Sequence, residues 1–252
     1  MYTIKEISKD EAFKLVWKFH YNSSLPRLIK HCLGGFIDDE LVAVMTLGWG
    51  VRPLHTIKKL FPSLTAQDYY ENGRMCLDDK LPRNSESQFI SECVEFIKIN
   101  YPNIKILFSW SDGMMGKPGY VYQASAFLYG GYIWTDSYFS LNGERIHPRQ
   151  TNRIGGRPSW EQMQELQWRH FKGKQFKYIR FICSHKERKQ LLEESTVLWS
   201  QNFPKHADLA WKVKTKNGWK ISSKPFYDLN EMTHNKKIGE KRLKILNKFP
   251  PK

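Results

Sequence analysis

The sequence LGGFIDDELVAVMTLGW, residues Leu33–Trp49, predicts two neighbouring antiparallel strands. The segment GGFI has a strand-like pattern, and LVAVMTLGW is an apolar run of the kind that forms a buried strand. Asp38 and Asp39 lie between the two segments, and aspartate favours tight turns. A β-hairpin is therefore expected here.

The segments on both sides of this hairpin alternate between helical and extended patterns. Before it, apolar residues from Ala12 to Phe19 recur at helical spacing and predict a helix over residues 8–20. After it we expect a long connection or short helix at 51–70, an extended segment at 70–77, a helix at 87–100, a strand at 105–110, a helix at 119–128 closed by Gly130-Gly131, a strand at 132–141 turning at Asn142-Gly143, a helix at 160–171, a strand at 176–183 and a helix at 186–199. This order predicts one mixed α/β domain over residues 1–206.

Positive charge dominates the 252-residue chain, which has 40 lysines and arginines, 25 aspartates and glutamates, and a formal net charge of +15. A field of this sign favours polyanionic partners. Nucleic acid is favoured over membrane because the sequence has no run of about 18 apolar residues. The alternative is a basic protein that the charge merely keeps in solution.

The positive charge is concentrated near the C-terminal end. Residues 207–252 contain 12 lysines and arginines and 4 aspartates and glutamates. We interpret this segment as a basic extension that contacts nucleic acid and is partly ordered around Trp211 and Trp219. A solvated basic tail is the alternative.

The four cysteines lie far apart, with no C-x-x-C pair and no signal peptide before them. Each lies among apolar residues, which favours a role as a small buried side chain over metal ligation. The pattern predicts a reducing compartment such as the cytoplasm. These cysteines are Cys32, Cys76, Cys93 and Cys183.

The segment LDDKLPRNSESQF brings three polar residues, Asn84, Ser85 and Ser87, to the start of a predicted helix. Free backbone N–H groups and the helix dipole attract anions at such a position. A phosphate-bearing cosubstrate could bind there. Alternatively, Ser85 or Ser87 only caps the helix, with Gln88 completing a capping box from Ser85.

The segment GYVYQASAFLYGGY places Tyr122 in the first turns of a predicted helix, close to the end of the preceding strand. Ligands collect at strand ends in open α/β sheets. The Tyr122 hydroxyl could donate a proton to a leaving group or position a nucleophile. An aromatic residue that only packs in the core is the alternative.

The segments ENGR and SWSD end two predicted strands and carry Glu71, Arg74, Ser109 and Asp112. Polar residues at neighbouring strand ends converge, so an acid, a base and an arginine could share one site. Arg74 and Asp112 could equally form a structural ion pair.

The segment FHYNSSLPR follows the first predicted helix and contains His20, Tyr21 and Arg27. The His20 imidazole could act as a base or a metal ligand, or simply cap the helix. His20, Glu71 and Asp112 could in principle form a facial site for iron, although they are distant in sequence and no local ligand pair exists.

Five segments in order resemble the Mom family of phage DNA-modification proteins, from Phe19 to Lys205. LPRNSES and GYVYQA are the most specific parts of this resemblance. The segments are FHYNSSLP, GGFIDDELVAVMTLG, ENGRMCLDDKLPRNSESQFIS, FSWSDGMMGKPGYVYQASAFLYGG, and KYIRFICSHKERKQLL with NFPK.

The resemblance implies a GNAT-like acyltransferase fold with a mostly antiparallel central sheet flanked by helices. It also implies an enzyme that converts adenine in DNA to an N6-carbamoylmethyl form, protects the DNA from restriction and works in the host cytoplasm. By motif, the implied catalytic residues are Arg74, Ser87, Asp112 and Tyr122. We further expect the cosubstrate to contact Asn84, Ser85 and Ser87, and the substrate to contact His20, Tyr21, Glu71 and Ser109.

The chain departs from the usual GNAT pattern in one loop. The glycine-containing pyrophosphate loop before the central helix is replaced by LPRNSES. This difference leaves the donor open between acetyl-CoA and another acyl or aminoacyl donor.

The expected partner is double-stranded DNA with the target adenine flipped out of the stack, because N6 is otherwise hard to reach. Asp112 could accept the N6 proton, Tyr122 could protonate the leaving group, and Arg74 could bind a carboxylate or hold Asp112 in place. Two alternatives remain, an acetyltransferase for a small amine or a protein and a non-catalytic DNA-binding anti-restriction protein. No membrane partner is expected, and the oligomeric state is open.

Overall fold

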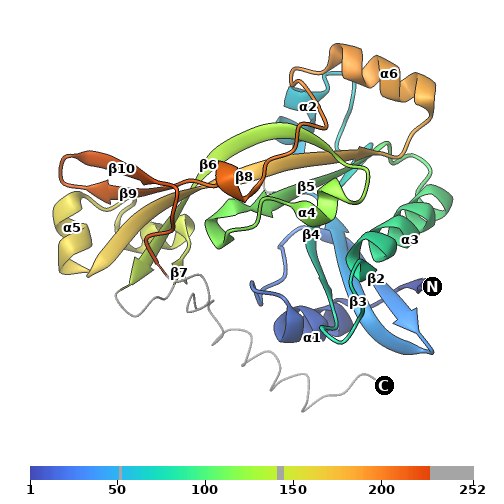
Figure 1. Ribbon diagram of the computed structural model, residues 1–252, viewed down its shortest axis with the longest axis horizontal. Helices are drawn as coiled ribbons and strands as arrows, with labels where there is room; N and C mark the ends of the chain where they lie inside the picture. The colour runs from blue at the N-terminus through green and yellow to red at the C-terminus, as the bar shows by residue number, and fades with distance from the viewer. Residues whose placement is uncertain (51–52, 141–144, 228–252) are drawn as a thin grey trace.

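The computed structural model describes residues 1–50, 53–140 and 145–227, which form one sheet with helices on both faces (Figure 1). Within these ranges the strand order is β1-β2-β3-β4-β5-β8-β6-β7, with β9 paired to β8 and β10 paired to β9. The strands are β1 (Thr3–Glu6), β2 (Ile29–Ile37), β3 (Glu40–Gly48), β4 (Tyr69–Leu77), β5 (Ile106–Asp112), β6 (Leu128–Ser140), β7 (Arg145–Ile146), β8 (Trp168–Phe181), β9 (Trp211–Thr215) and β10 (Gly218–Ser222). The helices are α1 (Lys9–Phe19), α2 (Pro53–Leu60), α3 (Ser85–Asn100), α4 (Tyr120–Gln123), α5 (Trp160–Glu165) and α6 (His185–Glu194), with 3₁₀ turns η1 (Gly113–Met115), η2 (Pro148–Ile154) and η3 (His206–Asp208).

Antiparallel pairing dominates the sheet. Among the described strands every neighbouring pair is antiparallel except β4 with β5, which is parallel. The predicted mixed α/β class with a mostly antiparallel sheet flanked by helices is therefore confirmed.

The hairpin of β2 and β3 forms where the sequence predicts it. Asp38 and Asp39 form its turn, with φ angles of 49° and 62°. Two consecutive residues in this left-handed region match the twist of the flanking strands, and aspartate tolerates the conformation better than most residues. The turn fixes the register in which Ile37 pairs with Glu40.

Helices α1 and α3 cover opposite faces of the sheet. Val44 of β3 packs with Ala12 and Val16 of α1, whereas the next residue, Met45, belongs to the cluster of Phe89 on α3. Consecutive strand residues point to opposite faces, which places the two helices on different sides.

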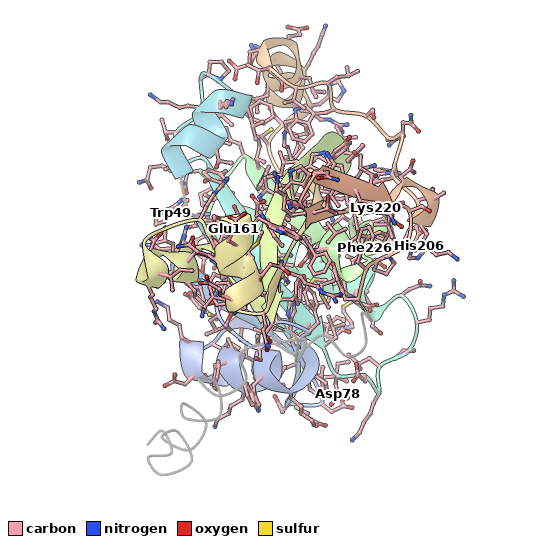
Figure 2. All side chains as sticks on the ribbon, turned by 90° about the vertical axis from the view of Figure 1, so that its left-hand side faces the viewer. Trp49, Asp78, Glu161, His206, Lys220 and Phe226 are labelled. Carbon is pink, nitrogen blue, oxygen red and sulfur yellow. The ribbon has the colours of Figure 1, made fainter. Side chains whose placement is uncertain are left out.

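Helices α2 and α6 share the face that lies opposite α3. Ile106 and Phe108 of β5 pack with Leu60 of α2 and Leu191 of α6, whereas Leu107 belongs to the α3 cluster. Figure 2 shows α2 and α6 toward one end of the molecule and α1 toward the other. The sheet is thus covered by α1, α2 and α6 on one face and by α3 on the other.

The predicted helix at 119–128 is wrong in its second half. Helix α4 ends at Gln123, and Ala126 has a φ of 56°, a left-handed conformation that a helix cannot continue through. Strand β6 begins at Leu128, and Gly130 and Gly131 lie within it rather than at a helix end.

The predicted helix at 160–171 is also too long. Gln167 has a φ of 55°, which reverses the chain after α5, and β8 begins at Trp168. The strand expected at 176–183 therefore starts earlier and ends at Phe181. Helix α6 ends at Glu194 rather than at residue 199, and the turn expected at Asn142-Gly143 lies outside the described residues.

Strands β6 and β8 extend beyond the rest of the sheet and carry β9, β10 and β7 with them (Figure 1). We call this part of the sheet, residues 132–140 and 168–175 with β7, β9 and β10, the arm. Strand β9 pairs with β8 through Phe171, Lys172 and Gly173. Trp211 of β9 is only 2% exposed, and its indole Nε1 donates to the Met114 carbonyl over 3.2 Å. The described part of the extension beyond residue 206 is therefore built into the sheet.

Among the described residues, no helix is long and apolar enough to span a membrane. All four cysteines lie in the described residues and are unpaired there, and Cys32, Cys76 and Cys93 are buried as expected.

Candidate functional site

Strands β4 and β5 pair side by side from Tyr69 and Ile106 to Asn72 and Ser109. Beyond this point β4 continues along β3, while β5 continues along β8. We call the point of divergence the fork. The polar ends of both strands lie here, which is the arrangement that ENGR and SWSD predict.

Glu71 and Arg74 are the charged residues that β4 brings to the fork. Burial raises the pKa of the Glu71 carboxyl to about 7, and Arg74 opposes this shift only in part. Burial likewise lowers the pKa of the Arg74 guanidinium, with Tyr21 and Asp112 acting against it. Arg74 Nε donates to the Ser24 carbonyl over 3.0 Å, on the face of the sheet that α1 covers.

A glycine leaves room for the Glu71 carboxylate. A Cβ added at Gly50 would lie 2.2 Å from Glu71 Oε2, which is closer than real contacts allow. A side chain at residue 50 would therefore displace the end of the Glu71 side chain.

Asp112 ends β5 and forms an ion pair with Arg145 of β7. The distance from Arg145 Nη1 to Asp112 Oδ2 is 3.4 Å, and Arg145 Nε donates to Ser137 Oγ over 2.9 Å. Asp112 also accepts a hydrogen bond from the Met114 backbone N–H. Across the described residues the ion partner of Asp112 is Arg145, so the alternative of an Arg74–Asp112 pair is wrong.

Tyr21 and His20 border the same face of the fork. Burial, followed by the charge of Asp112, raises the pKa of the Tyr21 hydroxyl. The His20 ring stacks on the Tyr21 ring at a centroid distance of 4.4 Å, and Lys117 Nζ lies 5.3 Å from the centroid of the Tyr21 ring. The His20 Nδ1 is already engaged by the backbone of Asn22.

Tyr122 reaches the fork from α4, on the opposite face. Burial raises the pKa of its hydroxyl, while Ser109 and Arg74 lower it. Helix α4 begins after Gly119, whose φ of +100° is a left-handed conformation, and a Cβ there would lie 2.5 Å from the Tyr178 ring. Glycine at 119 is therefore what lets α4 approach β8 and aim Tyr122 at β5.

Asn72 and Ser109 pair across the two strands at the point where the fork opens, and both are buried, at 5% and 0% exposure. In the described part of the chain, the buried side-chain nitrogen and oxygen atoms without a hydrogen-bond partner are Asn72 Nδ2, Asn72 Oδ1 and Ser109 Oγ. The Tyr122 hydroxyl interacts with the Ser109 hydroxyl closely enough to lower the Tyr122 pKa, although the two do not reach the geometry of a full hydrogen bond.

The start of α3 lines a hollow of about 440 Å³, which also touches Ala124 just after α4. Asn84 precedes the helix with a φ of 72° and makes no side-chain capping bond to the described residues, so the capping box expected from Ser85 and Gln88 is wrong. Ser85 Oγ donates to the Pro82 carbonyl, and Ser87 Oγ donates to the Asn84 carbonyl. We call this space the α3 hollow.

The residues expected from the sequence thus form two groups. The first contains Tyr21, Glu71, Arg74, Ser109, Asp112 and Tyr122, which meet at the fork with His20 at its border. The second contains Asn84, Ser85 and Ser87 at the α3 hollow.

The structure gives no support to an iron site. In the ranges that it describes, no three histidine, cysteine, aspartate or glutamate side chains are grouped so that they could hold a metal ion. His20, Glu71 and Asp112 therefore do not form the facial ligand set considered from the sequence.

Lysines and aromatic rings alternate on one surface of the arm. Lys212 Nζ lies 4.0 Å from the Trp134 ring centroid, and Lys174 Nζ lies 4.6 Å from that of Tyr132. Trp219 has Lys172 at 4.6 Å and Lys214 at 5.8 Å. These contacts join β6, β8, β9 and β10, and we call the seven residues the lysine–aromatic surface.

Three residues of the fork were not singled out from the sequence. Asn72 lies inside the ENGR motif, but the motif suggested chemical roles only for its neighbours Glu71 and Arg74. Arg145 becomes a partner of Asp112 only because β7 folds back along β6, and Gly50 is explained only by the position of Glu71.

Comparisons with known proteins agree with the resemblance seen in the sequence. A sequence model described as the Mom protein family matches residues 1–205. A curated relative, the methylcarbamoylase mom of Escherichia phage Mu, is 33% identical over 177 residues, which cover 69% of this chain and 71% of the relative.

Solved acetyltransferase structures show a weaker similarity, each with a TM-score of 0.39. A Bacillus subtilis acetyltransferase in complex with CoA is 13% identical and covers 72% of this chain and 99% of its own. A probable acetyltransferase from Staphylococcus epidermidis is 12% identical, with the same coverage. A GNAT-family acetyltransferase from Streptococcus pneumoniae is 9% identical and covers 73% of this chain and 100% of its own.

Proposed function

Because this chain belongs to the Mom protein family, we propose that it is a transferase that modifies the N6 amino group of adenine in DNA. The group added would be of the carbamoylmethyl type, and the modified DNA would resist restriction. The observation that carries this proposal is the buried cluster of acid, phenol and guanidinium groups at the fork.

Glu71 is the group best suited to accept the proton that N6 loses. A base works best when its pKa lies near the working pH, and the pKa of Glu71 is about 7. Asp112, the proton acceptor expected from the sequence, is held by Arg145 through Oδ2 and by the Met114 N–H through Oδ1, so both of its oxygens are already engaged. In this proposal Asp112 positions the substrate and Glu71 takes the proton.

The reaction requires one bond to form and one to break. The N6 nitrogen bonds to the carbon of the transferred group while the bond from that carbon to the leaving group breaks. Glu71 takes the N6 proton, and the leaving group departs with the bonding electrons and receives a proton from Tyr122. The raised pKa of Tyr122 keeps its hydroxyl protonated, so it can hydrogen-bond to the leaving group and transfer its proton as negative charge develops there.

The two reactants would approach the fork from opposite faces. The flipped adenine would enter beside Tyr21, Glu71 and Asp112, on the face that α1 covers. The donor, an acyl or aminoacyl compound that carries the group on a leaving group, would lie along the α3 hollow. The positive end of the α3 helix dipole, which faces this hollow, favours an anionic part of this donor, such as a phosphate.

The lysine–aromatic surface and the basic extension would hold the DNA. Lysines that follow a strand surface neutralise phosphates, and exposed rings such as Trp219 can stack on bases. Duplex DNA is the proposed partner, with the protein acting in the host cytoplasm.

Mass spectrometry of nucleosides tests the proposed function. Plasmid DNA from cells expressing the protein is digested and compared with DNA from cells expressing an Asp112→Ala variant. We expect an adenosine species heavier than deoxyadenosine in the first sample and none in the second. Unmodified nucleosides from well-expressed wild-type protein would favour an acetyltransferase for small amines or a protein that only binds DNA.

A further inference from the structure

The fork contains an amide and a hydroxyl that the fold itself leaves without partners. Asn72 Nδ2, Asn72 Oδ1 and Ser109 Oγ are buried and form no full hydrogen bond with the described residues, although the Tyr122 hydroxyl lies near Ser109. Burying such groups without partners costs free energy that a fold normally avoids. Their arrangement therefore points to a partner outside the chain.

These two residues point to the face of the sheet that α3 covers. Tyr70 and Leu107 lie two positions earlier on the same strands, and both belong to the core cluster of α3. Residues two apart in a strand share a face. Asn72 and Ser109 are thus on the side of Tyr122 and the α3 hollow, opposite the side on which Arg74 meets Ser24.

The chemistry of the two side chains specifies what they can bind. The Asn72 amide offers one N–H donor face and one carbonyl acceptor, and the Ser109 hydroxyl can donate or accept. A primary carboxamide offers the same pair in reverse, so that two hydrogen bonds can form between the two amides. A carboxylate lacks the N–H donor that Asn72 Oδ1 needs.

We propose that Asn72 and Ser109 form a binding site for the carboxamide of the transferred group. This inference rests on the proposed function, since that function supplies a group with a carboxamide end. The site would orient the group with its reactive carbon toward N6, and it would select an amide over the corresponding acid. Adenine offers a similar donor next to an acceptor, but it is expected on the opposite face.

The first test relies on one difference: polar groups that wait for a ligand lower the stability of the free protein but support its activity. Asn72→Leu removes two unpartnered polar atoms and Ser109→Ala removes one, so both variants should unfold at the same or a higher guanidinium concentration than the wild type. Both should reduce the modified adenosine in plasmid DNA at least about tenfold, the loss expected for one buried hydrogen bond.

Ser125→Ala is the matched control for these variants. Ser125 is a buried serine, at 3% exposure, whose Oγ has a partner in the Val121 carbonyl at 2.7 Å. This variant should be less stable than the wild type. If Asn72→Leu and Ser109→Ala are destabilised in the same way, their polar atoms have structural partners and the proposal is overturned.

The second test uses small probes in place of the unidentified donor. Acetamide should raise the melting temperature of the wild type, and acetate at the same concentration and ionic strength should not. Asn72→Leu should abolish the acetamide response, and Asn72→Asp should weaken it. Guanidinium and heat are used because urea is itself an amide.

The outcomes separate this proposal from the proposed function. An acetamide response that persists in Asn72→Leu, or an Asn72-dependent response to 9-methyladenine alone, would overturn the carboxamide assignment. If wild-type protein leaves adenine unmodified while acetamide still acts through Asn72, the proposed function fails and the amide site remains.

Discussion

Arg145 Nη1 lies 3.4 Å from Asp112 Oδ2, so a residue of β7 holds the carboxylate that ends β5. Both side chains are partly buried, at 21% and 14% exposure, which strengthens their interaction relative to a surface pair. Arg145 is itself fixed by Ser137. The pair ties the arm to the fork.

Arg145→Gln should therefore reduce adenine modification by about 10- to 100-fold, because Asp112 loses a charge-assisted hydrogen bond. Nucleoside mass spectrometry measures the change, and Arg145→Lys, which keeps the charge, should retain more activity. Equal activity in Arg145→Gln and the wild type would show that the reaction does not need the pair.

The pKa of Glu71 predicts how stability depends on pH. It rises from 4.5 in the unfolded chain to about 7 in the fold. Between these values the folded chain holds a proton that the unfolded chain has lost, so the free energy of unfolding falls as the pH rises from 4.5 to 7. Glu71→Gln should remove this dependence and stabilise the protein above pH 7 by at most about 3 to 4 kcal/mol. Denaturation at about pH 5 and about pH 8, on either side of the folded pKa, tests this, with exposed Glu193→Gln as the control.

The same residue predicts the pH dependence of the reaction. A base with a pKa of about 7 is mostly protonated at about pH 6, so activity should rise between about pH 6 and about pH 8. Glu71→Gln should lose activity at every pH. A wild-type profile that is flat over this range would argue against Glu71 as the proton acceptor.

Gly50→Ala should displace the Glu71 carboxylate, because the new Cβ would lie 2.2 Å from Oε2. Because the displaced atoms are the end of a flexible side chain, the loss of stability should be no more than the lower end of the roughly 1 to 3 kcal/mol typical of overpacking, and modification should fall as well. Thermal unfolding measures the first effect. The double variant Gly50→Ala/Glu71→Ala should be no less stable than Glu71→Ala alone, since the clash has been removed.

The lysine–aromatic surface predicts a change in salt dependence. Replacing Lys174, Lys212 and Lys214 with glutamine should weaken duplex binding and lower the log–log salt slope by about 0.9 for each phosphate that the protein no longer neutralises. Fluorescence anisotropy at several salt concentrations measures this slope. Replacing Lys58, Lys186 and Lys189, which are exposed on α2 and α6, makes the same charge change and should have a smaller effect.

Ser87→Ala tests the α3 hollow as the donor site. The variant removes a hydroxyl that borders the hollow, so modification should fall while duplex binding stays at the wild-type level. Ser184→Ala is the control, because Ser184 caps α6 and should affect stability by about 1 kcal/mol without affecting modification. Reduced duplex binding in Ser87→Ala would place the DNA, rather than the donor, at α3.

The sequence predicts much of the fold because its local signals agree with the tertiary structure. The β2–β3 hairpin has both an apolar pattern and a turn at Asp38 and Asp39, and α1 has both a helical pattern and a capping box between Ser8 and Glu11. The segments around Ala126 and Gln167 differ, because single left-handed residues there end short helices and start the long strands β6 and β8. Periodicity does not reveal such a reversal in a non-glycine residue.

The candidate site, like the fold, could be predicted from local sequence signals only in part. Motifs on β4 and β5 predict that Glu71, Arg74, Ser109 and Asp112 converge, since parallel neighbours bring their ends together. The partner of Asp112 depends on β7 folding back along β6. The interest of Asn72 depends on its buried amide having no hydrogen-bond partner among the described residues. Both properties depend on residues that are distant in sequence, so no single segment predicts them.

The way in which β9 joins the sheet limits how this protein can be shortened. The family match ends at residue 205, and the strand that covers Phe171 and Gly173 of β8 begins at Trp211. A fragment cut at the end of the family match would expose an unpaired strand edge and the apolar surface under Trp211, and both favour aggregation during expression. The smallest fragment suited to expression and crystallisation should therefore extend at least through β10.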